Sequence, residues 1–335
     1  MPADSRYKSL FEDFSQLNIM IIGDVMVDSY LWGKVERISP EAPIPIVALK
    51  RRENRMGGAA NVALNIKAMG ARPLLCSVIG NDEKGERFLE LLERERIRTE
   101  GIVQSKERVT TTKFRIFGNN IQMLRVDEEV QHELTPNDHQ KLLENIQSLV
   151  EREQVHCIIF QDYDKGVITP HLISEVVKLA AHKNIPVTVD PKKKNFTAYR
   201  DVTLFKPNLK ELREGMNIFA DVHDQNSLKE AAEKVFEALN CRYVLITLSE
   251  AGVMISRRSQ ADDEAIFIPS HVRSVADVSG AGDTVISVAS LCLARGCAPH
   301  EIAFISNLAG GLVCEEVGVV PVNKEKLLRE VLSLL

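Results

Sequence analysis

Residues 275–296 read VADVSGAGDTVISVASLCLARG, a short glycine-rich loop that runs directly into an apolar helix. In this loop Gly280, Ala281 and Gly282 can turn successive backbone N–H groups toward one position, and the positive end of the helix dipole adds to them. The stretch therefore predicts an anion-binding site. A P-loop would place a lysine after the glycines, whereas here Asp283 stands at the start of the helix, so a carboxylate lies beside a site for anions.

Short apolar strands alternate with helical segments along the rest of the chain. Residues 18–24 (NIMIIGD) have the pattern of a buried strand, and residues 57–70 (GGAANVALNIKAMG) that of a glycine turn entering a helix. This alternation predicts an α/β fold with a parallel sheet covered on both faces. Open α/β sheets bind ligands at the carboxyl ends of their strands. The polar residues expected at that edge are Asp24, Asp162, Asp190 and Asn208.

Two segments break the alternation. Residues 29–51 carry prolines at positions 40, 43 and 45 and have no helical period, and residues 108–127 form two alternating runs around GNN, a hairpin-turn composition. They predict a small β-sheet outside the main layers, formed by about residues 27–51 and 108–127. An apolar face on such a sheet needs cover, so we expect a lid over a ligand and a homodimer formed through it.

The bulk composition narrows the class of protein. We expect one domain over residues 1–335, with the lid as an appendage, and the net charge of −5 argues against nucleic-acid binding. Six cysteines without CxxC or zinc spacing indicate buried thiols in a reducing compartment. No apolar run reaches the roughly 18 residues of a membrane helix, and the N-terminus has no secretory pattern. A cytoplasmic protein without membrane partners is expected.

The motifs DVSGAGDT (277–284) and GGAANVA (57–63) resemble the two signatures of the PfkB (ribokinase-like) sugar-kinase family. Ordered matches run over about residues 18–321, and GDVMVDSYLWG, RISPEAPIPIV, DYDKG and KPNLKE resemble the heptose-7-phosphate kinase branch most. The resemblance implies a ribokinase-like three-layer αβα sandwich with a mostly parallel central sheet and a small β-sheet lid. Many relatives continue into a nucleotidyltransferase with an HxGH motif. None of the eight histidines forms that motif, so we expect a stand-alone kinase.

The resemblance also implies roles for individual residues around the phosphoryl group. Asp283 would be the catalytic base, with Gly280, Ala281 and Gly282 as the anion hole, and Asn208 and Glu211 (N-x-x-E) would organise magnesium and the ATP phosphates. The further ATP-binding candidates are Thr247, Glu250, Gly252, Asn307 and Gly310. Plainer interpretations stay open, because a carboxylate stabilises a helix N-terminus and N-x-x-E is also a helix capping box. Asn307 fits an ordinary helix residue as well.

On the sugar side, the resemblance implies a cradle for vicinal hydroxyls and cations for the phosphate that the sugar already carries. The cradle candidates are Asp24, Asp28, Gly57, Gly58, Asn61 and Asp190. The cationic candidates are Lys165, Lys192, Arg115 and Arg125; each alone also fits a solvated surface cation, and we expect at least two to bind. Asp277 and Ser279 match positions near a monovalent-cation site, and the use of potassium stays open.

The activity implied is ATP- and Mg²⁺-dependent phosphorylation of the anomeric hydroxyl of D-glycero-D-manno-heptose 7-phosphate. The 1,7-bisphosphate produced would be a precursor of ADP-heptose and lipopolysaccharide. An alternative keeps the family and changes the acceptor to ribose, fructose, fructose phosphate or another sugar phosphate. A non-catalytic sensor would lack Asp283 or the loop glycines, which are present. A Rossmann dehydrogenase is excluded because no GxGxxG follows residues 18–24.

Overall fold

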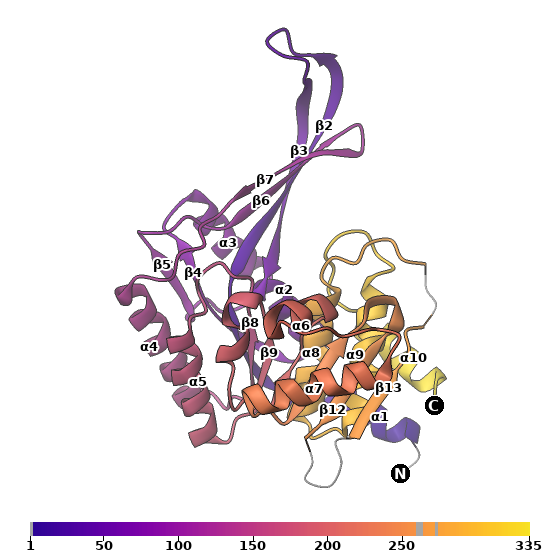
Figure 1. Ribbon diagram of the computed structural model, residues 1–335. Coiled ribbons are helices and arrows are strands. Elements are labelled where there is room, and N and C mark those ends of the chain that lie inside the picture. The colour runs from indigo at the N-terminus through magenta and orange to yellow at the C-terminus, as the bar shows by residue number, and fades with distance from the viewer. Residues whose placement is uncertain (1–2, 259–263, 272–273) are drawn as a thin grey trace.

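The computed structural model describes residues 3–258, 264–271 and 274–335, which form two β-sheets and the helices around them (Figure 1). The strands of the larger sheet are β1 (Asn18–Gly23), β4 (Arg72–Gly80), β5 (Ile102–Ser105), β8 (Cys157–Gln161), β9 (Val187–Asp190), β10 (Leu204–Phe205), β11 (Tyr243–Thr247), β12 (Val253–Arg257) and β13 (Glu264–Ile268). Their order is β13-β12-β11-β10-β9-β8-β1-β4-β5. The pairs from β5 to β11 are parallel, and β12 and β13 join one edge in antiparallel pairing. The predicted mostly parallel sheet is confirmed.

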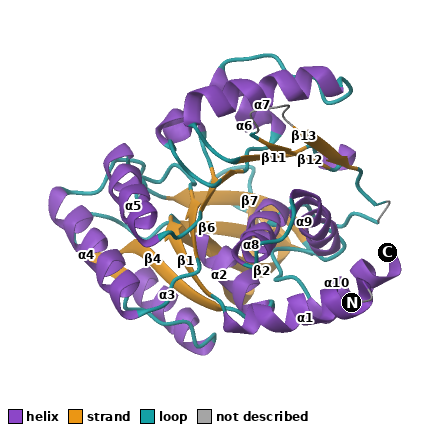
Figure 2. Ribbon diagram, turned by 90° about the horizontal axis from the view of Figure 1, so that it is seen from below, coloured by secondary structure: helices purple, strands orange, loops and turns teal. Residues whose placement is uncertain are grey.

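Helices cover both faces of this sheet, and each face has its own apolar core. Along β1, Ile19 and Ile21 belong to one core and Met20 and Ile22 to the other, because successive side chains of a strand point to opposite faces. The first core is closed by α1 (Ala3–Asp13), α2 (Ala59–Ala68), α3 (Glu83–Arg94), α8 (Ala281–Ala294), α9 (Pro299–Val313) and α10 (Lys324–Ser333). The second is closed by α4 (Pro136–Arg152), α5 (Pro170–Lys183), α6 (Leu209–Met216) and α7 (Gln225–Leu239). Figure 2 shows α8 and α9 on one side of β11 and β12, with α6 and α7 on the other, which confirms the three-layer sandwich.

The smaller sheet projects from the body as a twisted arm (Figure 1). It consists of β2 (Val25–Ile38), β3 (Pro45–Gly58), β6 (Thr112–Gly118) and β7 (Ile121–Glu128), in the order β3-β2-β6-β7. The pairs β2–β3 and β6–β7 are antiparallel, whereas β2 and β6 are parallel. The small second sheet predicted from segments 27–51 and 108–127 is therefore present. We call these four strands the arm.

Local sequence explains the two places where the chain reverses direction within the arm. Asn119 and Asn120 have φ angles of 53° and 66°, the left-handed values that a two-residue hairpin turn requires. Pro40 and Pro43 lie in the bend between β2 and β3, and Pro45 begins β3. Proline has no N–H to donate inside a strand, so it is found at bends and at the first residue of strands. The hairpin predicted around GNN is confirmed.

The topology gathers the polar strand ends at one edge of the larger sheet. Asp24 follows β1, Asp162 follows β8, and Asp190 ends β9. Because β1, β8, β9 and β10 are parallel neighbours, the segments that leave them emerge side by side. This edge is where the candidate site is found.

None of the helices in the described segments combines the length and the apolar character needed to cross a membrane. None of the six cysteines, all in the described part of the chain, forms a disulfide, and four of them are buried. Burial raises the pKa of the Cys76 thiol to about 12, so this side chain behaves as a small apolar core residue.

Candidate active site

A cavity of about 880 Å³ opens at the carboxyl edge of the larger sheet. The predicted site residues that line it are Asp190, Lys192, Asn208, Glu211, Thr247, Glu250, Gly252, Gly280, Ala281, Gly282, Asp283, Asn307 and Gly310. Other lining residues that the motifs did not single out include Gln161, Tyr163, Lys206, His271 and Cys314. The fold therefore brings the glycine-rich loop at the start of α8 and the KPNLKE segment to the same cavity.

The glycine-rich loop forms the N-terminus of α8. Gly280 is the cap residue, with a φ of 83°, and a Cβ there would lie 3.0 Å from Asn61 Nδ2 and 3.2 Å from a methyl of Val319. Both the backbone conformation and the space therefore require glycine. The first turn of any helix has N–H groups without intrahelical partners, and in α8 these belong to residues that line the cavity. This arrangement is suited to holding an anion.

Asp283 is buried in the first turn of α8 and is held by three donors. Its Oδ1 accepts hydrogen bonds from the Tyr163 hydroxyl (2.6 Å) and from Gln161 Nε2 (3.1 Å), and its Oδ2 accepts from Asn61 Nδ2 (2.7 Å). Burial raises the pKa of Asp283 to about 6, although the bonds from Asn61 and Tyr163 act in the opposite direction. The result is a fixed carboxylate that is mostly ionised at pH 7 and can take up a proton.

Two amide oxygens next to Asp283 have no partner. Asn61 Oδ1 and Gln161 Oε1 are buried and accept no hydrogen bond from any atom in the described part of the chain. Leaving a buried acceptor unpaired is costly. Of the two residues, Gln161 lines the cavity. Neither Gln161 nor Tyr163 was predicted from sequence; the available signal was that Gln161 ends the buried strand β8 at the ligand edge and Tyr163 lies two residues further on.

A buried ion pair lies beside the loop. Lys206 Nζ is 3.1 Å from Asp190 Oδ1, and the two side chains are 2% and 8% exposed. Gln161 Nε2 donates to the other oxygen of Asp190 at 3.2 Å, so the amide of Gln161 bridges Asp190 and Asp283. Lys206, the first residue of KPNLKE, was also not predicted as a site residue.

Asn208 and Glu211 form a reciprocal capping box at the start of α6. Asn208 Oδ1 accepts from the Glu211 amide (2.8 Å), and Glu211 Oε2 accepts from the Asn208 amide (2.9 Å). The other oxygen of Glu211 pairs with Lys192 Nζ. The capping interpretation left open above is thus seen in the hydrogen bonds. Both residues also line the cavity, and their predicted magnesium role stays a prediction.

The predicted ATP-binding residues come from β11, the turn after it, and α9. Thr247 ends β11, and its backbone forms an isolated parallel β-bridge with that of Asn208. Glu250 and Gly252 lie in the turn that follows. Asn307 donates from Nδ2 to the carbonyl of Pro269 at 3.0 Å, so its amide fixes the segment after β13. At Gly310, a Cβ would lie 2.6 Å from Val285, which shows how closely α9 approaches α8.

Asp24 holds the DYDKG loop through its backbone. Its Oδ2 accepts from the amides of Tyr163 (2.9 Å) and Lys165 (3.2 Å), and its Oδ1 from that of Val167 (3.0 Å). Burial and the nearby charge of Asp162 raise the pKa of Asp24 to about 6. The carboxylate therefore positions the loop that carries Tyr163, and its predicted sugar contact stays a prediction.

The glycine pair brings β3 close to Asp28. A Cβ at Gly57 would lie 2.4 Å from Asp28 Oδ2, and one at Gly58 would lie 2.4 Å from the carbonyl oxygen of Asp24. Asn61 follows on the first turn of α2 and reaches Asp283. The segment of residues 57–61 therefore contacts Asp28 at its start and Asp283 at its end.

Each of the four predicted cations has an acidic partner. The pairs are Arg115–Asp28, Lys165–Glu129 (2.7 Å), Lys192–Glu211 and Arg125–Asp127 (3.0 Å). Arg125 is 55% exposed, whereas Arg115 is 20% exposed and lies 5.3 Å from the centre of the Tyr30 ring. Arg55, which was not predicted, packs over the same ring at 4.9 Å. Of the four, Lys192 lines the cavity and Arg115 contacts a cradle residue.

Asp277 and Ser279 shape the approach to the glycine loop. Asp277 Oδ1 accepts from the Ser279 amide at 2.9 Å, and its Oδ2 accepts from the Gly318 amide at 3.0 Å. These bonds tie the loop before α8 to the segment after α9. Their predicted cation site stays untested.

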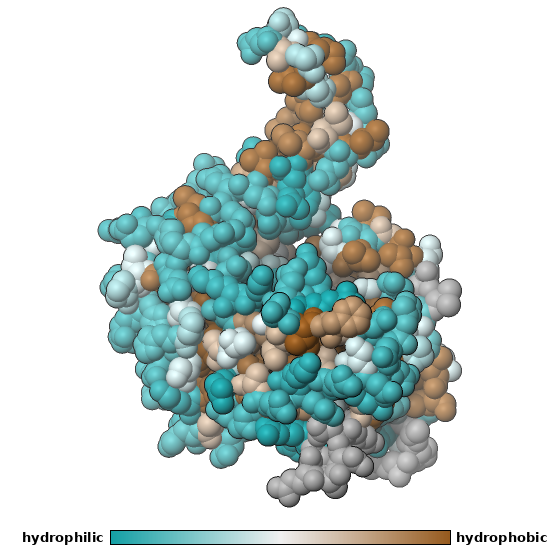
Figure 3. All heavy atoms as spheres, viewed as in Figure 1, coloured by the Kyte–Doolittle hydropathy of each residue, from teal (hydrophilic) through white to brown (hydrophobic). Residues whose placement is uncertain are grey.

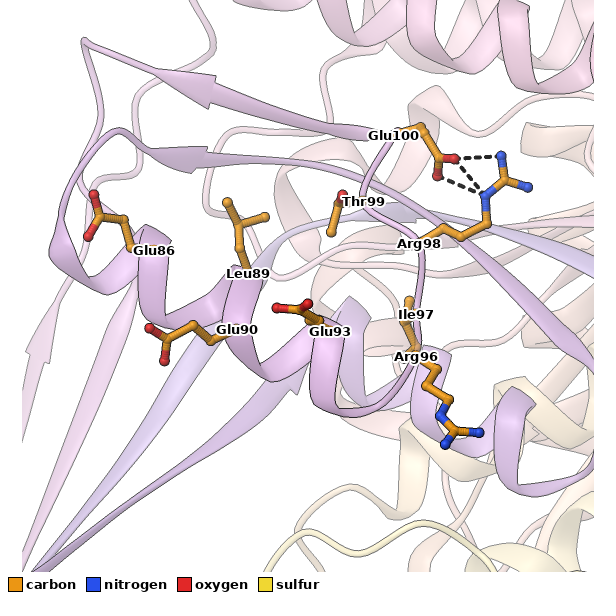
Figure 4. Close-up of a pocket in the computed structure, with 9 residues that line it drawn as sticks. All are labelled: Glu86, Leu89, Glu90, Glu93, Arg96, Ile97, Arg98, Thr99 and Glu100. Atoms are coloured by element: carbon orange, nitrogen blue, oxygen red, sulfur yellow. Dashed lines mark hydrogen bonds and ion pairs between the residues drawn. The ribbon is translucent and has the colours of Figure 1, made fainter.

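A second hollow of about 640 Å³ lies along α3, away from these residues (Figure 4). Its lining includes Glu86, Glu90 and Glu93 from one helix, and an ion pair between Arg98 and Glu100 at 2.6 Å. None of the predicted site residues lines it.

Comparison with known proteins assigns this arrangement to a family. The sequence profile described as pfkB family carbohydrate kinase matches residues 16–326. Two relatives named Bifunctional protein HldE, from Geobacter sulfurreducens and Citrifermentans bemidjiense, are each 38% identical over 96% and 97% of this chain. The chain spans 64% and 65% of their respective lengths.

Solved structures show the same fold. Phosphofructokinase-2 from Escherichia coli in complex with potassium superposes with a TM-score of 0.76 at 17% identity, covering 95% of this chain and 98% of its own. Arabidopsis thaliana ribokinase complexed with ribose and ATP gives 0.69 at 16% identity, covering 93% and 98%.

Proposed function

Since the chain belongs to the pfkB family of carbohydrate kinases, we propose that it transfers the γ-phosphoryl group of ATP to the anomeric hydroxyl of D-glycero-D-manno-heptose 7-phosphate. The product would be the 1,7-bisphosphate, a precursor of ADP-heptose and lipopolysaccharide. The observation that carries the kinase chemistry is the buried Asp283 directly beside the N-terminus of α8. The heptose phosphate is supported by the branch motifs and by the 38% identical relatives named Bifunctional protein HldE.

In this proposal Asp283 takes the proton of the attacking hydroxyl. The sugar oxygen then bonds to the γ-phosphorus, the bond from that phosphorus to the ADP oxygen breaks, and ADP leaves with the electron pair. A carboxylate with a pKa of about 6 is ionised near neutral pH and basic enough to accept the proton. Backbone N–H groups of the glycine loop would hold the phosphoryl oxygens.

The nucleotide would lie along the cavity between the loop and β11. Thr247, Glu250 and Gly252 would contact it from β11 and the turn that follows, and Asn307 and Gly310 from α9; all five line the cavity. The phosphates would then lie toward Asn208 and the N-terminus of α8. Asn61, which donates a hydrogen bond to Asp283, would contact the sugar.

The proposal includes magnesium near Glu211, one of the acidic residues that line the cavity. Within the described residues, no three His, Cys, Asp or Glu side chains are grouped to bind a metal. In this proposal the ion is held chiefly by phosphate oxygens and water. Glu211 would hold that hydrated ion indirectly. When bound, Mg²⁺ neutralises charge on the phosphates.

Potassium near Asp277 and Ser279 is a further part of the proposal. It is supported by the phosphofructokinase-2 chain of the same fold that was solved with potassium. Activity in potassium compared with tetramethylammonium salt tests it, and equal rates in both would refute it.

The phosphate already on the sugar would be held by at least two of the four predicted cations. Arg115 is one candidate, because it contacts the predicted cradle residue Asp28. A guanidinium can hold a phosphate through two parallel hydrogen bonds, whereas lysine acts as a point charge. Lys192, Lys165 and Arg125 remain the other candidates.

The arm would act as a lid and as the contact between two copies of the chain. Its exposed apolar side chains are Ile38, Leu49, Ile121, Met123, Leu124 and Val126, and Ile44 in the bend between β2 and β3 is exposed as well. Figure 3 shows hydrophobic residues gathered along the arm, on the face in view. A large exposed apolar surface is a common sign of an interface, and a homodimer would cover it.

A coupled ADP-release assay over a panel of sugars tests the proposed substrate. The panel contains D-glycero-D-manno-heptose 7-phosphate in both anomeric forms, ribose, fructose and fructose 6-phosphate. The proposal predicts the highest kcat/KM for the heptose phosphate. A higher value for ribose or fructose 6-phosphate would contradict the substrate while leaving the kinase chemistry in place.

A further inference from the structure

Lys206 is an ionisable side chain for which the family motifs supply no role. It follows β10 directly and lines the cavity, yet its side chain is only 2% exposed. Removing an ammonium group from water is costly unless its charge and donors are satisfied. A buried lysine at the ligand edge therefore needs an explanation.

The described protein atoms satisfy Lys206 only in part. Across residues 3–258, 264–271 and 274–335, Asp190 is its one ion-pair partner, at 3.1 Å from Oδ1. An ammonium has three N–H donors, so two remain for a ligand. Asp190 is fixed in turn by Gln161, which keeps the ammonium in one place.

The position of Nζ relative to α8 indicates which ligand it meets. A Cβ built at Gly282 would lie 3.7 Å from Lys206 Nζ and 3.8 Å from Asp190 Oδ2. The ammonium is thus beside the first turn of α8, where the helix already favours negative charge. The glycine at 282 leaves the space in front of Nζ free of a side chain.

We propose that Lys206 is a catalytic residue that donates hydrogen bonds to the phosphoryl group as it passes from the nucleotide to the sugar. This inference rests on the proposed kinase function. In this step the hydroxyl proton goes to Asp283, the sugar oxygen bonds to the γ-phosphorus, and the bond from that phosphorus to the ADP oxygen breaks as ADP leaves. The lysine missing after the loop glycines is thereby supplied from the segment that follows β10, and Asp190 positions it.

Lys192, the other lysine of the cavity, is less suited to this role. Its side chain is 36% exposed, it pairs with Glu211, and its Nζ lies 5.8 Å from the centre of the Tyr163 ring. A hydrated surface ammonium interacts more weakly with a phosphoryl group than a buried one, because water screens its charge.

The test compares two pairs of proteins that differ only in the ammonium group: wild type with Lys206→Met, and Asp190→Asn with Asp190→Asn/Lys206→Met. The second pair lacks the Asp190 carboxylate, so it remains informative if Lys206→Met alone fails to fold. Single-turnover transfer is measured with saturating ATP and the acceptor that wild type phosphorylates fastest. In each pair we expect loss of Lys206 to slow transfer about 100-fold to 1,000-fold, the usual effect of removing one transition-state donor.

A binding measurement separates catalysis from structural support. ADP, magnesium and aluminium fluoride with the acceptor mimic the transferring phosphoryl group. Lys206→Met should weaken this complex by about the same factor as transfer, while ADP alone binds within about threefold of wild type. Transfer rates within threefold of each other in both pairs, or equal weakening of ADP and the aluminium fluoride complex, would overturn the role of Lys206. A wild-type chain that phosphorylates no sugar would instead refute the proposed function.

Discussion

At the scale of single residues, the site is organised around a carboxylate whose position is fixed before any ligand binds. Asp283 is held by Tyr163, Gln161 and Asn61. The sequence predicted Asp283 and Asn61 through their motifs. It could not predict Gln161, Tyr163 or Lys206, because their proximity depends on the order of β8, β9 and β10 in the sheet and no local pattern encodes that order.

Replacing Tyr163 by phenylalanine should shift the pH dependence of activity. The Tyr163 hydroxyl favours the ionised form of Asp283, so its loss raises the pKa of that carboxyl above about 6. Since the base must be ionised, the acid limb of the kcat/KM profile should move to higher pH, and kcat should fall about tenfold.

Tyr199→Phe is the matched control, because this hydroxyl donates to Asp162 and not to Asp283 (2.8 Å). Its acid limb should coincide with that of wild type. Identical profiles for both variants would show that Tyr163 does not act through Asp283.

The buried carboxylate of Asp283 should also make the protein less stable at neutral pH than a neutral side chain of the same size would. The pKa of Asp283 rises from 3.8 to about 6 on folding, so the folded state favours the protonated form. That contribution to stability is fully present below about pH 4 and is lost as the pH rises through about 6. Asp283→Asn should therefore increase the free energy of unfolding by up to about 3 kcal/mol at pH 7 and by less at pH 4. Urea denaturation at both pH values checks this, and a larger gain at pH 4 would contradict it.

At the scale of elements, the loop before α8 has a conformation that only glycine adopts easily. The glycine motif, the GNN hairpin and the alternation of strands and helices were all readable from sequence because each depends on local backbone preferences. The parallel pairing of β2 with β6 was not, since it joins segments about 85 residues apart by a contact that neither segment specifies alone.

Gly280→Ala should reduce both stability and activity. The φ of 83° and the close contacts with Asn61 and Val319 predict a loss of about 1–2 kcal/mol in unfolding free energy. The same displacement would move Asn61 and the loop N–H groups, so kcat should fall at least tenfold.

Gly296→Ala is the control at the other end of α8. Its φ is 70°, and a Cβ there meets no described atom within 4 Å. It should cost about 1 kcal/mol for the backbone alone and leave kcat unchanged. Thermal denaturation and steady-state kinetics distinguish the two variants. A Gly280→Ala protein with the same kcat as Gly296→Ala would argue against the anion-binding role of the loop.

At the scale of the whole molecule, the arm is the feature that a single chain does not explain. It projects from the body with exposed apolar residues on β7, among them Leu124 at 55% and Val126 at 45% exposure. Composition and alternation predicted that such a sheet exists and that a ligand and a second copy of the chain cover it. That cover stays a prediction, because it depends on a surface outside the fold of one chain.

The double variant Leu124→Asp/Val126→Asp should convert a dimer into a monomer. Charged residues in the centre of an apolar interface lose their hydration without gaining partners. Light scattering after size exclusion should give twice the chain mass for wild type and a single chain mass for the variant. Phe219→Asp, which changes an 81% exposed residue outside the arm, should remain dimeric. A monomeric wild type at tens of micromolar would contradict the proposed interface.

The central claim is that Asp283 is the base of a sugar kinase, and single-turnover transfer by Asp283→Asn tests it most directly. The variant keeps the size of the side chain but cannot accept the hydroxyl proton. We predict that ATP binds within about threefold of wild type while phosphoryl transfer to the sugar falls by about three orders of magnitude or more. Transfer within tenfold of wild type, with ATP still bound, would contradict the account.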